Sequence, residues 1–170
     1  MAIIKTLRGH SPQIASSCFL ADNAVVIGDV SIGNESSVWF NAVIRGDVNK
    51  ITIGERVNIQ DNATIHCTYE KYETTIGNNV SIGHNAIIHG CTIEDNVLIG
   101  MGAMVLDGAV IPPFCMIAAG ALVPERKVLE SGFLYMGMPA KKIKPLSTKQ
   151  LQFFIERTAR NYVQYASWYQ

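Results

Sequence analysis

Residues 80–111 read VSIGHNAIIHGCTIEDNVLIGMGAMVLDGAVI, and this stretch decides the fold. A small residue follows several of its aliphatic positions by four, as Ala86 follows Ile82 and Ala103 follows Ile99. A fixed hexapeptide period of this kind is typical of a parallel β-helix. An aliphatic side chain returns every six residues, with one shorter step after the second, at Ile82, Ile88, Ile93, Ile99, Val105 and Ile111.

The same period extends over most of the chain. Three hexapeptides close one triangular coil, and the aliphatic and small residues point inward to form ladders along a narrow core. Side chains on adjacent coils then lie about 4.7–4.9 Å apart along the axis. We therefore predict an all-β solenoid, a parallel β-helix over residues 1–145. The outlying aliphatic positions are Ile14, Leu20, Val26, Ile32, Val38, Ile44, Ile53, Ile59, Ile65, Ile76, Ile117, Val123 and Leu129, and Tyr135 ends the series.

Two insertions interrupt the period. Three extra residues separate Ile44 from Ile53, and five extra residues separate Ile65 from Ile76. Insertions in a solenoid leave the coil on one face, often the binding face. We therefore expect both segments to be loops, the second of them at Tyr69–Glu73, close to His66.

From Leu146 the hexapeptide period stops and a helical one begins. Ser147 with Gln150 three residues later indicates a capping box. We predict one amphipathic helix up to about Trp168 within the segment 146–170, packed along the β-helix through an aromatic stripe. The stripe comprises Leu151, Phe154, Ile155, Tyr162, Tyr165 and Tyr169.

Composition limits the function classes. The chain is 48% hydrophobic and carries 14 basic and 14 acidic residues, so the total charge predicts no nucleic-acid partner and no membrane partner. The start, Met-Ala-Ile-Ile-Lys, has no long apolar stretch, so we expect a cytoplasmic protein.

The four cysteines form no CxxC pair. Cys18 and Cys115 fall on inward positions of distant coils, which predicts small core residues rather than a disulfide. Cys67 directly follows His66, so a ligand or redox role is left open for it.

Three of the four histidines lie within 24 residues of each other. Grouping the repeat into coils of three sides places Arg45, His66 and His89 in one outward column, one coil apart. His84 follows the second side of its coil, in line with Asp61, and so points from a different face. Three neutral nitrogen ligands suit a catalytic zinc. Because His84 cannot easily reach the other two within one chain, the geometry predicts a homotrimer with metal sites between subunits.

Polar residues surround this column. Arg45 and Asp47 have the spacing of a structural ion pair, and the subunit interface of such a trimer is one place for it. Gln60 is a candidate to orient a metal-bound water, and Asp61 is a candidate to hold Arg45 of a neighbouring subunit. His10 lies before the repeat and is interpreted as an ordinary surface residue.

Several motifs together resemble the γ-class carbonic anhydrases. The resemblance covers nearly the whole chain. It rests on Ile44-Arg45-Gly46-Asp47, Asn58-Ile59-Gln60-Asp61-Asn62, Ile65-His66, Gly83-His84 with His89-Gly90, Gly100-Met101-Gly102-Ala103 and Tyr135-Met136-Gly137-Met138-Pro139-Ala140.

This resemblance implies a left-handed β-helix that forms trimers and ends in a helix. It implies reversible hydration of carbon dioxide to bicarbonate by a zinc-bound hydroxide, with Fe²⁺ or Co²⁺ as other metals of the family. It assigns His66 and His89 as ligands from one subunit and His84 from its neighbour. It also implies that Gln60 positions the nucleophile, that Tyr135 lines the pocket, and that Arg45 and Asp47 tie subunits together.

The chain departs from the family pattern at two positions near the site. Val48 stands where active members have a glutamate, and Gly137 where they have an asparagine. Only Glu70 and Glu73, in a short loop, are available as a proton shuttle. Two alternatives therefore stay open: a trimeric metal-binding protein with little or no catalysis, and a hexapeptide acyltransferase that uses an acyl-coenzyme A donor.

Overall fold

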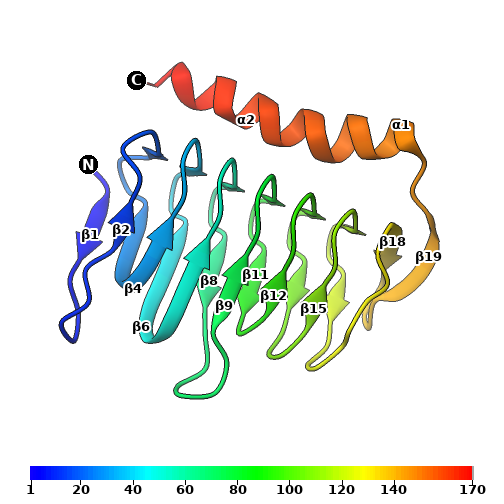
Figure 1. Cartoon of the computed structure of the whole chain (residues 1–170), viewed down its shortest axis with the longest axis horizontal. Coiled ribbons are helices and arrows are strands. Elements are labelled where there is room, and N and C mark those ends of the chain that lie inside the picture. The colour runs from blue at the N-terminus through cyan, green and yellow to red at the C-terminus, as the bar shows by residue number, and fades with distance from the viewer. Residues whose placement is uncertain (170) are drawn as a thin grey trace.

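The computed structural model describes residues 1–169 as a parallel β-solenoid of about seven turns with one C-terminal helix, the arrangement of a left-handed β-helix. Figure 1 shows the coils side by side, with the helix running back along their corners toward the N-terminal end. The predicted fold class is therefore confirmed. Within residues 1–169, no helix combines the length and the apolar character needed to cross a membrane.

Three rows of short parallel strands make the three sides of the coil. The first row is β3 (Phe19–Leu20), β5 (Ser37–Val38), β7 (Asn58–Ile59), β10 (Ser81–Ile82), β13 (Leu98–Ile99), β16 (Met116–Ile117) and β18 (Phe133–Met136). The second row is β8 (Thr64–His66), β11 (Ile87–His89), β14 (Met104–Val105) and β17 (Leu122–Val123). The third row is β9 (Thr74–Ile76), β12 (Thr92–Ile93) and β15 (Val110–Ile111).

Two long strands connect the second and third rows. β4 (Val25–Ile32) and β6 (Val43–Ile53) pair at both ends with a shift of register between, and the two halves of β6 pair on their other side with β8 and β9 respectively. β1 (Ile3–Lys5) and β2 (Gln13–Ile14) pair with the two halves of β4. In the N-terminal coils, one continuous strand therefore replaces the two short strands that form the second and third sides of later coils.

The register of the strands stacks the aliphatic positions as predicted. Ile59 pairs with Ile82, which pairs with Ile99 and then Ile117, and each of these side chains is at most 1% exposed. Gly83 shows how close the coils are, since a Cβ built there would lie 2.7 Å from the backbone nitrogen of Met101. A larger residue at that corner would push two coils apart.

The expectation of a loop between Ile44 and Ile53 is wrong. The three extra residues stay within β6, where the register with β4 shifts between Gly28 and Val30. Gly28 and Gly46 permit this irregularity because the two backbones touch there: a Cβ built on Gly28 would lie 2.2 Å from the carbonyl oxygen of Gly46. A bulge absorbs extra residues without ending the strand. The second insertion does leave the coil, as the loop between β8 and β9 that protrudes in Figure 1.

The last coil ends in an antiparallel pair that the hexapeptide period does not predict. β19 (Lys141–Pro145) turns back along β18, and its five residues are all exposed. β19 is therefore the edge strand of the first row.

The C-terminal helix begins with the predicted capping box, in which Ser147 and Gln150 exchange hydrogen bonds. It continues through α1 (Thr148–Gln150), a π-helical segment η1 (Leu151–Glu156) and α2 (Arg157–Ser167). Tyr162 packs edge-on against Trp39, with ring centroids 5.3 Å apart, and Tyr169 also contacts this ring. Most of the predicted stripe thus lies on the β-helix, whereas Phe154 is 38% exposed and Tyr169 is 58% exposed despite its contact with Trp39.

Candidate metal centre

His66 and His89 lie next to each other on adjacent coils. They end β8 and β11, and the parallel pairing of these strands places the two residues directly opposite each other. The ring centroids are 5.1 Å apart, and Nδ1 of His66 faces Nε2 of His89 at 3.1 Å. The predicted column of histidines is therefore present in the chain.

A carboxylate holds each imidazole from its outer side. Oδ1 of Asp47 lies 2.9 Å from Nε2 of His66, and Oδ1 of Asp107 lies 2.6 Å from Nδ1 of His89. An ionised carboxylate only accepts hydrogen bonds, so the outer nitrogen of each ring carries a proton. In the neutral rings, the inner nitrogens then present lone pairs to each other.

This donor set fits a metal ion. Two nitrogen ligands of a tetrahedral zinc ion, each at about 2.0–2.1 Å, lie roughly 3.3 Å apart. The observed 3.1 Å between His66 and His89 is close to that separation. The outer carboxylates are what metal-bound histidines commonly have, because they fix the tautomer and the ring orientation.

The two carboxylates have supporting contacts of their own. Arg45 donates to the second oxygen of Asp47, and Thr68 donates to the second oxygen of Asp107. Burial opposes ionisation of Asp47, but hydrogen bonds from His66 and Arg45 outweigh it and hold the pKa of Asp47 below its usual value. Burial of Asp107 is likewise outweighed by hydrogen bonds from Thr68 and His89, which lower its pKa. Both groups are therefore carboxylates at neutral pH.

Three other predicted residues, His84, Asp61 and Gln60, lie at another corner of the coil. His84 follows β10, and its Nδ1 lies 2.8 Å from Oδ2 of Asp61, which follows β7. Gln60 is 6% exposed and donates to Asn58 at 2.9 Å. Asp61 thus pairs with His84 inside the chain, and its contact with Arg45 of a neighbouring subunit stays a prediction.

One chain does not assemble a complete ligand set. Within residues 1–169, no three histidine, cysteine, aspartate or glutamate side chains are grouped so that they could hold a metal ion. Two clusters exist instead, which we call the histidine pair (His66 and His89) and the His84 corner (Gln60, Asp61 and His84). The third ligand from a second chain stays a prediction.

Tyr135 lies on β18 and is 3% exposed. Its hydroxyl accepts from the backbone nitrogen of Glu130 at 2.7 Å and donates to the carbonyl oxygen of the same residue at 3.0 Å. These bonds hold the turn before β18. Three strand steps separate β18 from β10 in the sheet, so a pocket-lining role for Tyr135 stays a prediction.

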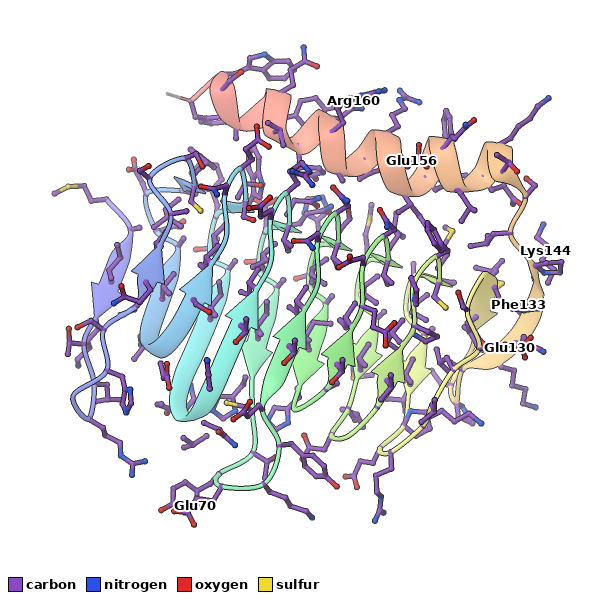
Figure 2. All side chains as sticks on the ribbon, in the orientation of Figure 1. Glu70, Glu130, Phe133, Lys144, Glu156 and Arg160 are labelled. Atoms are coloured by element: carbon purple, nitrogen blue, oxygen red, sulfur yellow. The ribbon has the colours of Figure 1, made fainter. Side chains whose placement is uncertain are left out.

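Glu70 and Glu73 are both exposed in the loop between β8 and β9. Glu70 lies at the tip of this loop in Figure 2, and it lines a pocket of about 260 Å³ together with Asp47, Val48 and His10. Cys67 is buried and donates to the carbonyl oxygen of Asn49 at 3.1 Å. Burial raises the pKa of the Cys67 thiol to about 11, which disfavours the thiolate that a ligand or redox role requires.

Asp107 and Thr68 are site residues that the sequence analysis does not single out. Leu106 is the outward residue one coil after His89, and Asp107 directly follows it in the sequence. Gly90 permits the contact, since a Cβ built there would lie 2.3 Å from Oδ1 of Asp107. A glycine directly after the histidine and an aspartate 18 residues, one coil, beyond it are the signals that point to this pair.

Comparisons with known proteins agree with the fold and the motifs. Residues 73–106 match the family described as bacterial transferase hexapeptide (six repeats). The chain superposes on a hexapeptide transferase family protein from Anaplasma phagocytophilum with a TM-score of 0.94 and 40% identity, over 99% of this chain and 98% of that one. Fold and repeat therefore define a hexapeptide-repeat β-helix protein.

Relatives with similar sequences identify the family of the chain more specifically. It is 42% identical over 167 residues to a carbonic anhydrase of Geobacillus kaustophilus, covering 98% of this chain and 91% of the relative. It is 44% identical over 161 residues to the mitochondrial gamma carbonic anhydrase 2 of Arabidopsis thaliana, covering 92% of this chain but only 58% of the longer plant protein. The chain belongs to the γ-class carbonic anhydrase-like family of hexapeptide-repeat proteins.

Proposed function

We propose that this protein is a metal-dependent lyase that hydrates carbon dioxide reversibly, with its metal site between the subunits of a homotrimer. One observation carries the proposal: two imidazole nitrogens face each other at 3.1 Å, and a carboxylate holds each ring from behind. The identity to proteins named carbonic anhydrase supports the same reaction.

In the proposed site, His66 and His89 of one subunit and His84 of its neighbour hold Zn²⁺, or Fe²⁺ or Co²⁺ in its place. When bound, such an ion acts as a Lewis acid and lowers the pKa of a coordinated water to about 7. Asp47 and Asp107 orient the two imidazoles, and Asp61 orients His84 in the same way.

Gln60, Glu70 and Glu73 are the candidates for the other roles in the proposed reaction. The side-chain nitrogen of Gln60 donates to Asn58, and within residues 1–169 its amide carbonyl has no hydrogen-bond donor, so this oxygen can accept one. It is the candidate to orient the attacking oxygen. Glu70 is the candidate to carry the released proton to solvent, since it and Asp47 line one pocket and its carboxylate is exposed. Glu73 is the second candidate, on the same loop.

Stopped-flow hydration of carbon dioxide tests the function, using protein loaded with zinc and, separately, with iron. We expect a rate well above that of His89→Ala prepared in parallel. Glu70→Gln should lower the rate in dilute buffer, and added imidazole should restore it, because a small base replaces the missing proton acceptor. Wild-type protein no faster than His89→Ala with full metal loading would refute the lyase.

Two observations favour other functions. Val48 adds no carboxylate beside Asp47, so a trimer that binds metal with little turnover is the second candidate. Its mark is full zinc occupancy without hydration of carbon dioxide. The names of the matching repeat family and of the Anaplasma structure favour a transferase. Turnover of an acyl-coenzyme A thioester by metal-free protein would support that third candidate.

A further inference from the structure

The charges of the chain are balanced in total but separated along the sequence. Residues 1–123 contain six Lys and Arg against eleven Asp and Glu, a net charge of −5. Residues 124–170 contain eight Lys and Arg against three Asp and Glu, a net charge of +5. Such asymmetry within a chain indicates an interaction surface for a charged partner.

Much of the positive charge lies at the C-terminal end of the solenoid. The sheet order ends with β18 and β19, and α1 begins three residues after β19. Figure 2 shows Lys144 at this end, near Glu130 and Phe133. Lys127 lines the same pocket of about 360 Å³ as Lys141 and Lys142. We call this surface the basic end, comprising Lys127, Lys141, Lys142 and Lys144.

Most of these cations have no acidic partner. Lys142 pairs with Glu130 at 2.6 Å. Among residues 1–169, the other three lysines of the basic end form no ion pair. Three positive charges therefore remain uncompensated on one end of the molecule.

Large apolar side chains are exposed between these lysines. Val128 is 65% exposed, Met136 44%, Met138 62% and Ile143 52%. Lysines on an edge strand are a common defence against strand pairing, and that role alone explains charge on β19. Protection of the edge strand does not explain the large apolar side chains exposed beside the lysines. Exposed apolar patches of this kind mark contact surfaces.

We infer that the basic end is a docking surface for membranes that contain anionic phospholipid. Two basic ends would repel each other, so this surface does not pair with itself; contact with the acidic residues 1–123 of another copy would instead give salt-sensitive oligomers on size-exclusion chromatography without vesicle binding. Lysine side chains are attracted to the phosphate groups of anionic lipids. Exposed methionine and isoleucine side chains can insert at the boundary between the headgroups and the acyl chains. This inference does not depend on the proposed enzymatic activity.

Co-sedimentation of the full chain with vesicles tests the inference, using phosphatidylcholine alone and phosphatidylcholine mixed with phosphatidylglycerol. We expect binding only to the mixed vesicles, and weaker binding at high salt. The triple variant Lys127→Gln/Lys141→Gln/Lys144→Gln should bind about a hundredfold more weakly, since each lysine near an anionic surface contributes about fivefold. Met138→Ser/Ile143→Ser should reduce binding through the apolar contribution.

The matched control removes the same charge elsewhere, as Lys5→Gln/Lys50→Gln/Lys71→Gln. This variant should bind like the wild type. Circular dichroism and size-exclusion chromatography identify variants that fail to fold or assemble, and the single substitutions then replace the triple one. Absence of binding to the mixed vesicles, equal binding to both vesicle types, or equal loss in both triple variants would overturn the inference. Retention on immobilised polyglutamate, without vesicle binding, would reassign the surface to an acidic protein.

Discussion

Nδ1 of His89 lies 2.6 Å from Oδ1 of Asp107, one coil further along the solenoid. The ionised carboxylate can only accept a hydrogen bond, so in the neutral ring the proton is on Nδ1 and Nε2 carries the lone pair that faces His66. The proposed metal site therefore depends on a residue from a coil that contributes no ligand.

Asp107→Asn is expected to weaken zinc binding by about 10–100-fold, the usual effect of losing an outer partner of a metal-bound histidine. The amide can no longer fix the proton on Nδ1, so the ring loses its preferred tautomer. Competition with a chromophoric chelator measures the affinity. Asp95→Asn is the control, because Asp95 accepts from the backbone and side-chain nitrogens of Asn78 on another corner. An unchanged affinity in Asp107→Asn would show that His89 is positioned without this carboxylate.

Metal sites between subunits predict complementation between two defective variants. His84→Ala and His89→Ala should each bind no zinc at the site. When the two are unfolded, mixed equally and refolded together, about one quarter of the sites should combine His84 from one chain with the histidine pair from another, as cyclic symmetry dictates. Zinc content after dialysis measures the recovery. No recovery in mixed oligomers would place all three ligands within one chain.

Gly90→Ala is expected to destabilise the fold and disturb the site together. The residue has a φ of 55°, and the added Cβ would approach Oδ1 of Asp107 to 2.3 Å. Gly102→Ala is a matched control with a φ of 64° and nothing within 4 Å. Left-handed strain alone costs about 1–2 kcal/mol. Urea denaturation should show a further loss of about 1–3 kcal/mol at Gly90, because the hydrogen bond of a charged group is displaced. Equal losses at the two glycines would contradict the close approach.

Thiol reactivity should follow burial and pKa. Burial raises the pKa of Cys67 to about 11 and that of Cys91 to about 12. At pH 8 the thiolate then amounts to roughly one part in a thousand and one in ten thousand, so alkylation of the folded protein is slow and accelerates as pH rises. Cys18 is only half-buried and should react first. Peptide mapping after iodoacetamide treatment gives the order, and rapid modification of Cys67 would reopen a redox role for it.

Much of the fold follows from local patterns. The hexapeptide period predicts the inward ladders, and Ser147 with Gln150 predicts the start of the helix, because each involves residues near in sequence. The bulge in β6 could not be predicted in this way. It depends on Gly28 and Gly46 meeting across two coils, and the period registers only that three residues were added.

The candidate site likewise contains contacts that the repeat predicts and contacts that it does not predict. Register alone brings His66 beside His89 and His84 beside Asp61, since the hexapeptide period, once the five inserted residues are set aside, converts sequence spacing into neighbourhood. Asp107 behind His89, Thr68 behind Asp107, and the two hydrogen bonds that engage Tyr135 with Glu130 follow from side-chain directions at corners. Spacing does not encode those directions.

The solenoid, the helix after it and the neighbourhood of the histidines could be predicted from the residues alone, because an aliphatic side chain every six residues is buried when the chain coils into a parallel β-helix. Tertiary structure decided which carboxylate supports each imidazole and how the lysines of the last coil come to share one exposed end. These contacts join residues from different coils, and their geometry depends on corner backbone and packing that no repeat specifies.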